Sequence, residues 1–482
     1  MAGSKPGSSR NFLWLSLVLL IILSITFLLP VGPLDYWFYV RIGRDTVQDL
    51  AVPQVDTISW SQFGRPIYYQ PWLSAVVFWL VYAGGGLALT FLLRGLLIGV
   101  TYGLIWKMMT GKGIGVFFAS LLTVLLALGT SNNWTMRPQL FAYPLFACSL
   151  FILSQWQEGE NRTLWALPLI GLLWANLHGS FILLFVLAGS ALLFGSGDRR
   201  KLILWIAVAA LGTLINPQHI KVWGYVGMML ESPSDQLFSV EWLPPQNLGW
   251  QMNIFFAWLL LFAPLVALSK RRLSLLGWIW VLSFGWLALS GTRYVIWFMF
   301  ILSIQTAVLL SGIDRLSARS VPDSKPILGY LLGCVFIFMT LPLLPTLRDL
   351  WWPAAPSPYS LGDTPVKATG WLADHPDIPG PLWNDYVFGS YLAFALPSRK
   401  PWMDSRFNAY PPEQWQEYRD LATASADWQD FFDQEGVNLL MLSYAGEPAL
   451  IDEVASAPEW CPLYQDPYAV IFARRGVSEA CQ

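Results

Sequence analysis

About eleven apolar stretches, each long enough or nearly long enough to cross a bilayer, divide this chain of 482 residues. Hydrophobic residues make up 55% of the chain and charged residues only 12%, which excludes a soluble globule of ordinary surface polarity. We therefore expect a polytopic α-helical membrane protein with about eleven transmembrane helices. The predicted spans are 12–30, 86–107, 114–131, 139–155, 163–177, 180–195, 201–216, 253–269, 273–290, 294–311 and 326–346.

The charges of the connecting loops predict which side of the membrane each loop faces. Lys and Arg cluster before the first span and after each later pair of crossings, and cytoplasmic loops are the ones that carry an excess of these residues. We therefore expect the N-terminus in the cytoplasm and the C-terminal domain outside it. The clusters are Lys5 with Arg10, Lys107 with Lys112, Arg162, Arg199–Lys201, Lys270–Arg272, and Arg315 with Arg319 and Lys325.

Some apolar segments are too short to be assigned as spans from their length alone. The stretch 71–83 has about thirteen residues where roughly 20 are needed, so we interpret it as an interfacial or re-entrant helix. The spans 163–177 and 180–195 are also short, and a turn at 176–179 joins them. Short, broken helices are tolerated at membrane depth where they line a cavity, which makes this turn a candidate cavity wall.

The predicted organisation has three parts. Residues 1–346 form the membrane domain, with a long first external loop at 31–85 that is too polar for lipid. A Pro- and Ser-rich linker, 347–359, leads to an external α/β domain at 360–482.

Within that tail, helical patterning covers 365–374 and 412–424, and apolar runs at 437–442 and 469–473 predict strands. Cys461 and Cys481 both lie in the tail and could pair in an oxidising compartment. The two other cysteines, Cys148 and Cys334, fall in predicted spans, where a small apolar role is expected.

Asp35 is the candidate catalytic acid of the first loop. It lies just after the first span, among aromatic residues 36–39. A carboxylate there can accept a proton from an acceptor hydroxyl, or hold a divalent cation, Mg or Mn, against a phosphate. The alternative is a solvated aspartate at the start of a helix.

Four basic residues of the predicted outer face are candidates for binding a phosphate. Arg41 could grip phosphate oxygens with its planar guanidinium, or it could bind lipid head groups or pair with Asp45. Arg137 and Arg293 lie where the charge rule makes Arg unusual, so each invites an anionic partner or snorkels to lipid phosphate. His178 could carry a proton, donate to phosphate or simply bond between helices.

Further polar residues complete the outer face. The other expected cavity residues are Asn176, Asn216, Glu241, Trp242, Asp56 and Gln70. In the tail, Asp385, Asp404 and Arg406 lie beside apolar segments, as a polar rim or as turn residues. The chain has no Walker loop, dinucleotide fingerprint, HExxH or Gly-x-Ser-x-Gly motif. A net charge of −2 without a basic run argues against a nucleic-acid partner.

The order of these motifs resembles the GT-C superfamily of membrane glycosyltransferases, in particular a bacterial branch that uses polyprenyl-phosphate-linked sugars. The resemblance covers nearly the whole chain, and it depends on the shared order rather than on any single motif. The matching segments are Asp35, Gly64–Pro66 with Trp72–Leu73, Arg137–Gln139, Trp174–Gly179, Asn216–Pro217, Glu241–Trp242 and Asp404–Arg406.

The resemblance implies transfer of a sugar from a polyprenyl-phosphate carrier to a glycan, lipid or protein acceptor outside a bacterial plasma membrane, with inversion at the anomeric carbon. Asp35 matches the first-loop acid that serves as base or helps to hold metal. Two other functions stay open from the sequence. A transporter of lipid-linked sugars would also need intramembrane polar residues, and a non-catalytic scaffold would bind a partner through its tail.

Overall fold

The computed structural model describes residues 8–231, 239–317, 326–360, 364–425 and 427–477. The chain divides into two compact units. The helical unit comprises Met1–Leu29, Gly85–Val226 and Val240–Ala355, and the loop–tail unit comprises Pro30–Gly84, Gly227–Ser239 and Pro356–Gln482, in each case as far as these residues are described. The first loop therefore groups with the C-terminal tail, whereas the sequence suggested a loop that belonged to the membrane domain.

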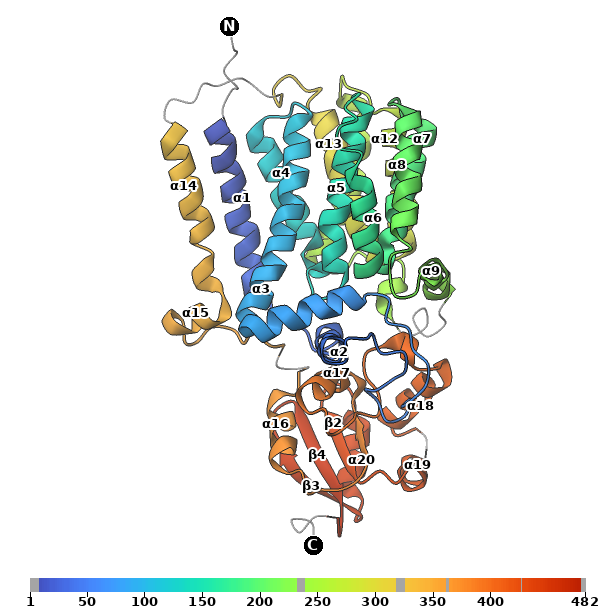
Figure 1. Cartoon of the computed structure of the whole chain (residues 1–482). Coiled ribbons are helices and arrows are strands. Elements are labelled where there is room, and N and C mark those ends of the chain that lie inside the picture. Colours follow the sequence, from blue (N-terminus) through green and yellow to red (C-terminus); the bar gives the residue numbers. More distant parts are fainter. Residues whose placement is uncertain (1–7, 232–238, 318–325, 361–363, 426, 478–482) are drawn as a thin grey trace. The chain divides into compact units, whose positions relative to one another are not determined.

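The helical unit contains a helix at the place of each predicted span (Figure 1). Among the described residues, seven helices are long enough and apolar enough to cross a membrane, by length and composition. This is the architecture of a multi-pass membrane protein. Crossing by the shorter helices α6, α7, α8 and α12 stays a prediction. The helices are α1 (Ser8–Leu28), α3 (Trp72–Gly111), α4 (Val116–Thr130), α5 (Gln139–Gln157), α6 (Ala166–Leu177), α7 (Ile182–Phe194), α8 (Arg199–Gly212), α11 (Gly249–Leu268), α12 (Leu275–Ser290), α13 (Val295–Leu310) and α14 (Pro326–Phe338).

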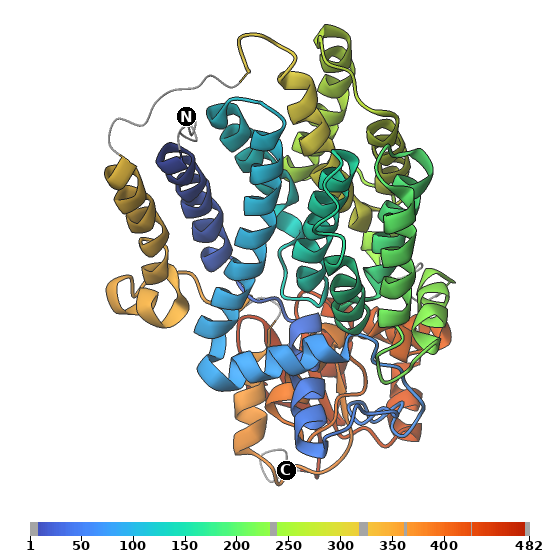
Figure 2. The ribbon, with the colours of Figure 1, turned by 45° about the horizontal axis from the view of Figure 1, so that its top comes forward.

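Helix α13 is central to the helical unit, and α14 is peripheral. In the segment that contains α13, 78% of the apolar window is buried, against 11% in the segment that contains α14. Helix α14 packs along α1 (Figure 2). Helix α12 packs along α13, and α6 packs along α8. The exposed apolar side chains of α14 are therefore suited to lipid.

Helix α3 carries a break where the two units meet in the sequence. Gly85 and Gly86 have non-helical backbone angles inside it, and Gly86 has a φ of 55°. A glycine adopts that left-handed conformation without the steric cost that a side chain would add. The stretch 71–83, expected as an interfacial or re-entrant helix, is thus the first part of a broken helix that continues to Gly111.

The loop–tail unit combines helices with one small sheet. Helix α2 (Asp35–Asp49) occupies the first loop and packs against α17 of the tail. The helices of the tail are α16 (Val366–Asp374), α17 (Tyr386–Ala395), α18 (Pro412–Ala422), α19 (Trp428–Gln434) and α20 (Pro448–Ser456). The strands are β1 (Leu382–Asn384), β2 (Leu439–Ser443), β3 (Trp460–Gln465) and β4 (Ala469–Arg474), in the order β1-β2-β4-β3.

The sheet is buried on both faces because helices cover each of them. Strand β1 pairs parallel to β2, and β4 runs antiparallel to both β2 and β3, with Leu440 opposite Phe472. Leu439 and Met441 pack with residues of α16 and α17 on one face, whereas Leu440 packs with residues of α18, α19 and α20 on the other. Burial of both faces explains why β2 is a continuous apolar run instead of an alternating one.

The predicted strands at 437–442 and 469–473 and the predicted helices at 365–374 and 412–424 are confirmed, with small shifts of their ends. Cys461 is disulfide-bonded, and Cys148 and Cys334 are free thiols. The predicted partner of Cys461, Cys481, lies outside the described residues.

Candidate functional site

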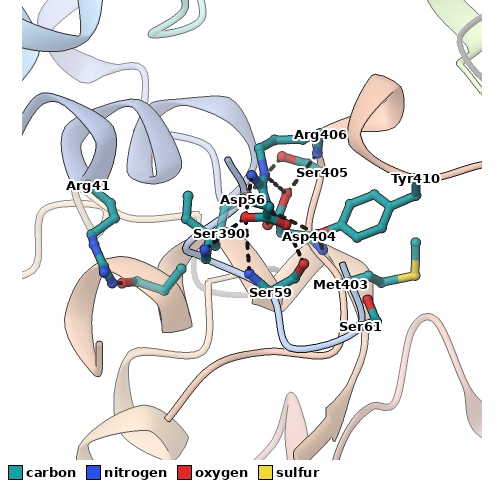
Figure 3. Close-up of polar contacts among 12 residues, drawn as sticks. Arg41, Asp56, Ser59, Ser61, Ser390, Met403, Asp404, Ser405, Arg406 and Tyr410 are labelled. Carbon is teal, nitrogen blue, oxygen red and sulfur yellow. Dashed lines mark hydrogen bonds and ion pairs between the residues drawn. The ribbon is translucent and has the colours of Figure 1, made fainter. Parts of the chain in front are cut away.

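The clearest polar centre of the loop–tail unit surrounds Arg406. We call this set the arginine clamp: Arg406, Asp404, Asp56, Tyr69 and Tyr410. Arg406 is 3% exposed, and its guanidinium lies 3.0 Å from Asp56 Oδ1 and 2.7 Å from Asp404 Oδ2. Figure 3 shows these three side chains converging, with Arg41 apart from them. The clamp therefore ties the first loop to the tail by buried, charge-assisted hydrogen bonds.

The clamp satisfies the guanidinium completely. The Nε of Arg406 donates to Asp404, Nη1 donates to Asp56 and to the Tyr69 hydroxyl at 2.6 Å, and Nη2 donates to both carboxylates. An Arg has five N–H donors, and these contacts engage all of them. Arg406 thus has no donor left for a substrate, and the polar rim suggested by the sequence is here a buried junction.

Charge and burial act in opposite directions on the groups of the clamp. Burial alone would raise the pKa of Asp56, but the Arg406 charge and hydrogen bonds hold that pKa below its usual value. Burial would lower the pKa of Arg406, whereas the Asp404 carboxylate and its neighbours raise that pKa well above its usual value. Both groups are therefore charged at neutral pH.

Asp35 is the first residue of α2, and it is half-buried. A carboxylate in the first turn of a helix is stabilised by the helix dipole. An aspartate at the start of a helix was the alternative to a catalytic acid in the sequence analysis. The Oδ1 of Asp35 also lies 3.5 Å from the hydroxyl of Ser405, which stands between the two charged residues of the clamp. The structure thus places the candidate acid beside the tail motif Asp404-Ser405-Arg406.

The segment 402–405 is held in place by the end of β1 and by α17. The side chain of Asn384 accepts from Trp402 N–H at 2.8 Å and donates to Met403 O at 3.0 Å. Gly389 of α17 lies so close that a Cβ there would be 2.1 Å from Met403 O. This close approach brings Ser390 to 2.9 Å from the Ser405 hydroxyl.

The first loop is joined to the tail over a wider region than the clamp. Trp60 N–H donates to Pro401 O at 3.0 Å, and the Trp60 indole donates to Leu382 O at 2.8 Å. Gln62 donates to the side chain of Gln414 at 2.5 Å. Gln70, expected to face a cavity, is itself buried.

Arg41, a predicted phosphate ligand, is engaged within the loop–tail unit. Its Nε lies 2.7 Å from Asp45 Oδ2, and its Nη1 donates to Ala393 O at 2.9 Å. The pairing with Asp45 was one of the alternatives that the sequence left open. A phosphate role for Arg41 would have to compete with both contacts.

In the helical unit, four of the predicted site residues come together. Arg137, just before α5, pairs with Glu241 of the short helix Val240–Trp242. The guanidinium of Arg293 lies 4.2 Å from the ring centroid of Trp242. Among the residues that the structure describes, no carboxylate forms an ion pair with Arg293, which is half-buried. A cation held against an aromatic face without an acid is suited to an anionic ligand.

His178 and the two asparagines shape the backbone around this cluster. His178 Nδ1 accepts from Ser180 N–H at 3.0 Å and so caps the turn between α6 and α7. His178 also interacts electrostatically with Arg293. Asn176 donates to Leu172 O and to Ile215 O, each at 2.8 Å. Asn216 donates to Thr213 O at 2.6 Å inside its own turn. These asparagines have structural roles in the described part of the chain.

Arg94 was not predicted as a site residue, although it is a single Arg inside the predicted span 86–107, and a charged residue within a span indicates a specific role. Arg94 is fully buried, and its Nη2 donates to Thr26 O at 2.6 Å and to Leu29 O at 2.5 Å. The last carbonyls of a helix lack partners within the helix, so this cation caps the end of α1.

A second buried polar group of the tail consists of Tyr418, Asp385 and Glu447, of which the sequence indicated only Asp385. The hydroxyl of Tyr418 lies 3.3 Å from Asp385 Oδ1 and 3.0 Å from Glu447 Oε1. Asp385 accepts from Val387 N–H at 2.8 Å as the N-cap of α17, so its role in the structure is that of a capping residue. Burial and the nearby Asp385 carboxylate raise the pKa of Glu447 well above its usual value.

No protein-family model and no curated protein matches this sequence. The structure is nevertheless similar to solved structures. Over 89% of this chain and 69% of the other, it matches the archaeal oligosaccharyltransferase AglB from Archaeoglobus fulgidus, at 12% identity and a TM-score of 0.57. Over 94% of this chain and 96% of the other, it matches ArnT from Cupriavidus metallidurans, at 13% identity and a TM-score of 0.52.

The chain also matches the arabinofuranosyltransferase AftD from Mycobacteria, at 16% identity and a TM-score of 0.54, over 98% of its own length but only 42% of AftD. At such identities the similarity establishes the fold. It supports the predicted polytopic helical membrane fold, while the number of crossings and the side on which the tail lies stay predictions.

Proposed function

We propose that this protein transfers a sugar from a polyprenyl-phosphate carrier to an acceptor hydroxyl at the outer face of the membrane. The observation that carries the proposal is the fold shared over most of this chain with an oligosaccharyltransferase and an arabinofuranosyltransferase. One of the AglB structures holds a dolichol-phosphate, a lipid of the class that would carry the donor. Nothing in the geometry favours a scaffold or a transporter.

Asp35 supplies the base in this proposal. The acceptor oxygen attacks the anomeric carbon, the bond from that carbon to the phosphate oxygen breaks, and the acceptor proton moves to Asp35. The configuration inverts, and the polyprenyl phosphate leaves with the bonding electrons. The helix dipole favours the charged form of a carboxylate at the start of α2, and the charged form is the one that can accept the proton.

We assign the donor phosphate to Arg293 in this proposal because of its own surroundings. Its guanidinium has an aromatic platform in Trp242 and no carboxylate partner among the described residues. Arg137 adds a second positive charge, balanced by Glu241, and His178 can donate from Nε2 when Nδ1 accepts from Ser180. Cations fixed near the departing phosphate stabilise the charge that develops there.

A divalent cation fits the described residues poorly. No group of three or more His, Cys, Asp or Glu among them could hold a metal ion. Asp56 and Asp404, the carboxylates of the arginine clamp, are occupied by Arg406. The proposal therefore uses Asp35 as a base and assigns no step to a metal.

The test is transfer by the purified full-length protein. Candidate donors are radiolabelled glucose, mannose, galactose and arabinofuranose on undecaprenyl phosphate, with a cell-envelope extract as the source of acceptor. The readout is released undecaprenyl phosphate, which forms whichever acceptor is used. We expect release from at least one donor and its loss in Asp35→Asn. Absence of release from every donor would contradict the proposal, and unchanged release by Asp35→Asn would remove Asp35 as the base.

A further inference from the structure

We propose that Ser405 is a positioning residue for Asp35, and that the arginine clamp exists to hold Ser405 in place. This inference rests on the proposed function, since it assigns a role in the same reaction. It makes the tail part of the catalytic machinery, because the tail fixes the geometry of an acid in the first loop.

Hydrogen-bond donors and acceptors set the direction of the contact. An ionised carboxylate only accepts, so the Ser405 hydroxyl must donate its single proton to Asp35 Oδ1. Ser405 must then accept from Ser390, whose hydroxyl lies 2.9 Å away. The two serines thus form a directed pair that ends at Asp35.

The backbone of Ser405 is fixed on both sides. Asp404 N–H donates to the Tyr410 hydroxyl at 3.0 Å, and Arg406 N–H donates to Asp404 Oδ1 at 2.9 Å. Ser405 is itself only 3% exposed, so its hydroxyl has little freedom to turn away.

The distance of 3.5 Å between Ser405 and Asp35 is long for a hydrogen bond. Catalytic hydrogen bonds are often long in the absence of substrate and tighten when the reacting groups bind. A contact of this kind directs Oδ1 of Asp35 toward Ser405 and so sets the orientation of the carboxylate. Ser405 therefore controls orientation and does not itself touch the reacting atoms.

The experiment compares Ser405→Ala with wild type in the release assay. We expect kcat to fall by between about 5- and 100-fold with KM for the donor nearly unchanged. Loss of a donor to the ionised carboxylate raises the pKa of Asp35, so the acidic limb of the kcat–pH profile moves up by about 0.5 to 1 unit. The matched control is Thr46→Val, which removes a buried hydroxyl of α2 that donates to Ile42 O at 2.7 Å, and which is expected to leave the acidic limb in place.

A double-mutant cycle separates this inference from the proposed function. If Ser405 acts through Asp35, then Ser405→Ala has no further effect in the Asp35→Asn background. Loss of activity in Asp35→Asn with wild-type kcat and pH profile in Ser405→Ala would overturn the positioning role alone. Wild-type activity in Asp35→Asn would remove Asp35 as the base and the positioning role of Ser405 with it, while the transfer of sugar would still stand.

Discussion

The guanidinium of Arg406 pairs with the carboxylate of Asp56 across 350 residues of sequence, with both side chains almost fully buried. This pair joins the first loop to the tail and makes one body of two segments that the sequence places far apart. The acid proposed as the base, Asp35, lies within the same body. The tail thus contributes to the surroundings of Asp35 and does not merely follow the membrane spans.

The first prediction concerns Asp56→Asn. Removing one partner of a buried ion pair leaves the other charge uncompensated, so we expect a loss of about 3 to 5 kcal/mol in the stability of the loop–tail unit at pH 7. Thermal unfolding followed by circular dichroism measures this loss. The control is Asp49→Asn, at an exposed position of α2, which should change little.

The loss in Asp56→Asn should depend on pH. The folded-state pKa of Asp56 is depressed, so its stabilising effect is present above the unfolded value of about 3.9 and is lost as the pH falls through the folded value. The difference between variant and wild type should therefore shrink as the pH falls below about 4. A difference that stayed constant from neutral to acid pH would contradict a charged pair.

The second prediction concerns Glu447. A folded-state pKa raised above the unfolded value gives stability that is fully present below the unfolded value and is lost as the pH rises toward the folded value. A phenol has one proton, so a protonated Glu447 could donate to the Tyr418 oxygen and leave the phenol proton for Asp385, which agrees with the raised pKa of Glu447. We therefore expect the stability of the wild type to fall as the pH rises above the range in which free glutamate titrates.

Glu447→Gln should abolish that dependence. Its amide can donate to Tyr418, and its oxygen can accept from Ser443 N–H, as protonated Glu447 does at 3.0 Å. Denaturant unfolding between pH 4 and 9 compares this variant with Glu453→Gln, which lies at an exposed position of α20. Parallel curves for wild type and Glu447→Gln would show that Glu447 is ionised in the folded protein.

The third prediction concerns Arg293. If its guanidinium holds the donor phosphate, Arg293→Met should weaken donor binding by about 1.5 to 3 kcal/mol, or roughly 10- to 150-fold. Arg293→Lys should recover part of this loss because the charge remains. Arg272→Met, which removes an exposed Arg of the predicted cytoplasmic cluster, is the control. Equal donor affinity in Arg293→Met and wild type would assign the Arg to the stacking contact with Trp242 alone.

The fourth prediction concerns Gly43 of α2. A Cβ at this position would lie 2.0 Å from Ala75 O, which belongs to the first part of α3. Gly43→Ala should therefore destabilise the loop–tail unit by about 1 to 3 kcal/mol. Gly370→Ala, in α16, has open space around its Cβ and should be neutral or mildly stabilising. Equal unfolding temperatures for the two variants would contradict the close approach of α2 and α3.

The sequence predicted the apolar helices and two of the four strands, because their signals are local. The strands β2 and β4 are long apolar runs. Strand β1 has only three residues, and β3 contains Pro462, which is compatible with its place at the edge of the sheet but weakens the pattern of a strand. The helix α17 carried an available signal, since Asp385 caps an apolar run.

The candidate site was predictable only in part. Arg137 and Arg293 were singled out because Arg is unusual at the outer ends of spans, and Glu241 and Trp242 because they match a motif of the GT-C resemblance. The structure groups the four residues within the helical unit. No periodicity or residue spacing in the sequence predicts the ion pair between Asp56 and Arg406. Such a contact depends on the packing of distant segments, and it appears only in three dimensions.

The pairing of Asp56 with Arg406 also constrains how the protein is made. A ribosome completes the first loop long before it reaches Arg406, and chains emerge at about 5 to 20 residues per second. The first loop is therefore synthesised before Arg406, and Asp56 lacks its ion-pair partner while the intervening helices enter the membrane. A chain released before residues 405 and 406 would hold Asp35 without the serine beside it, so the geometry proposed for catalysis can form only after these residues have been made.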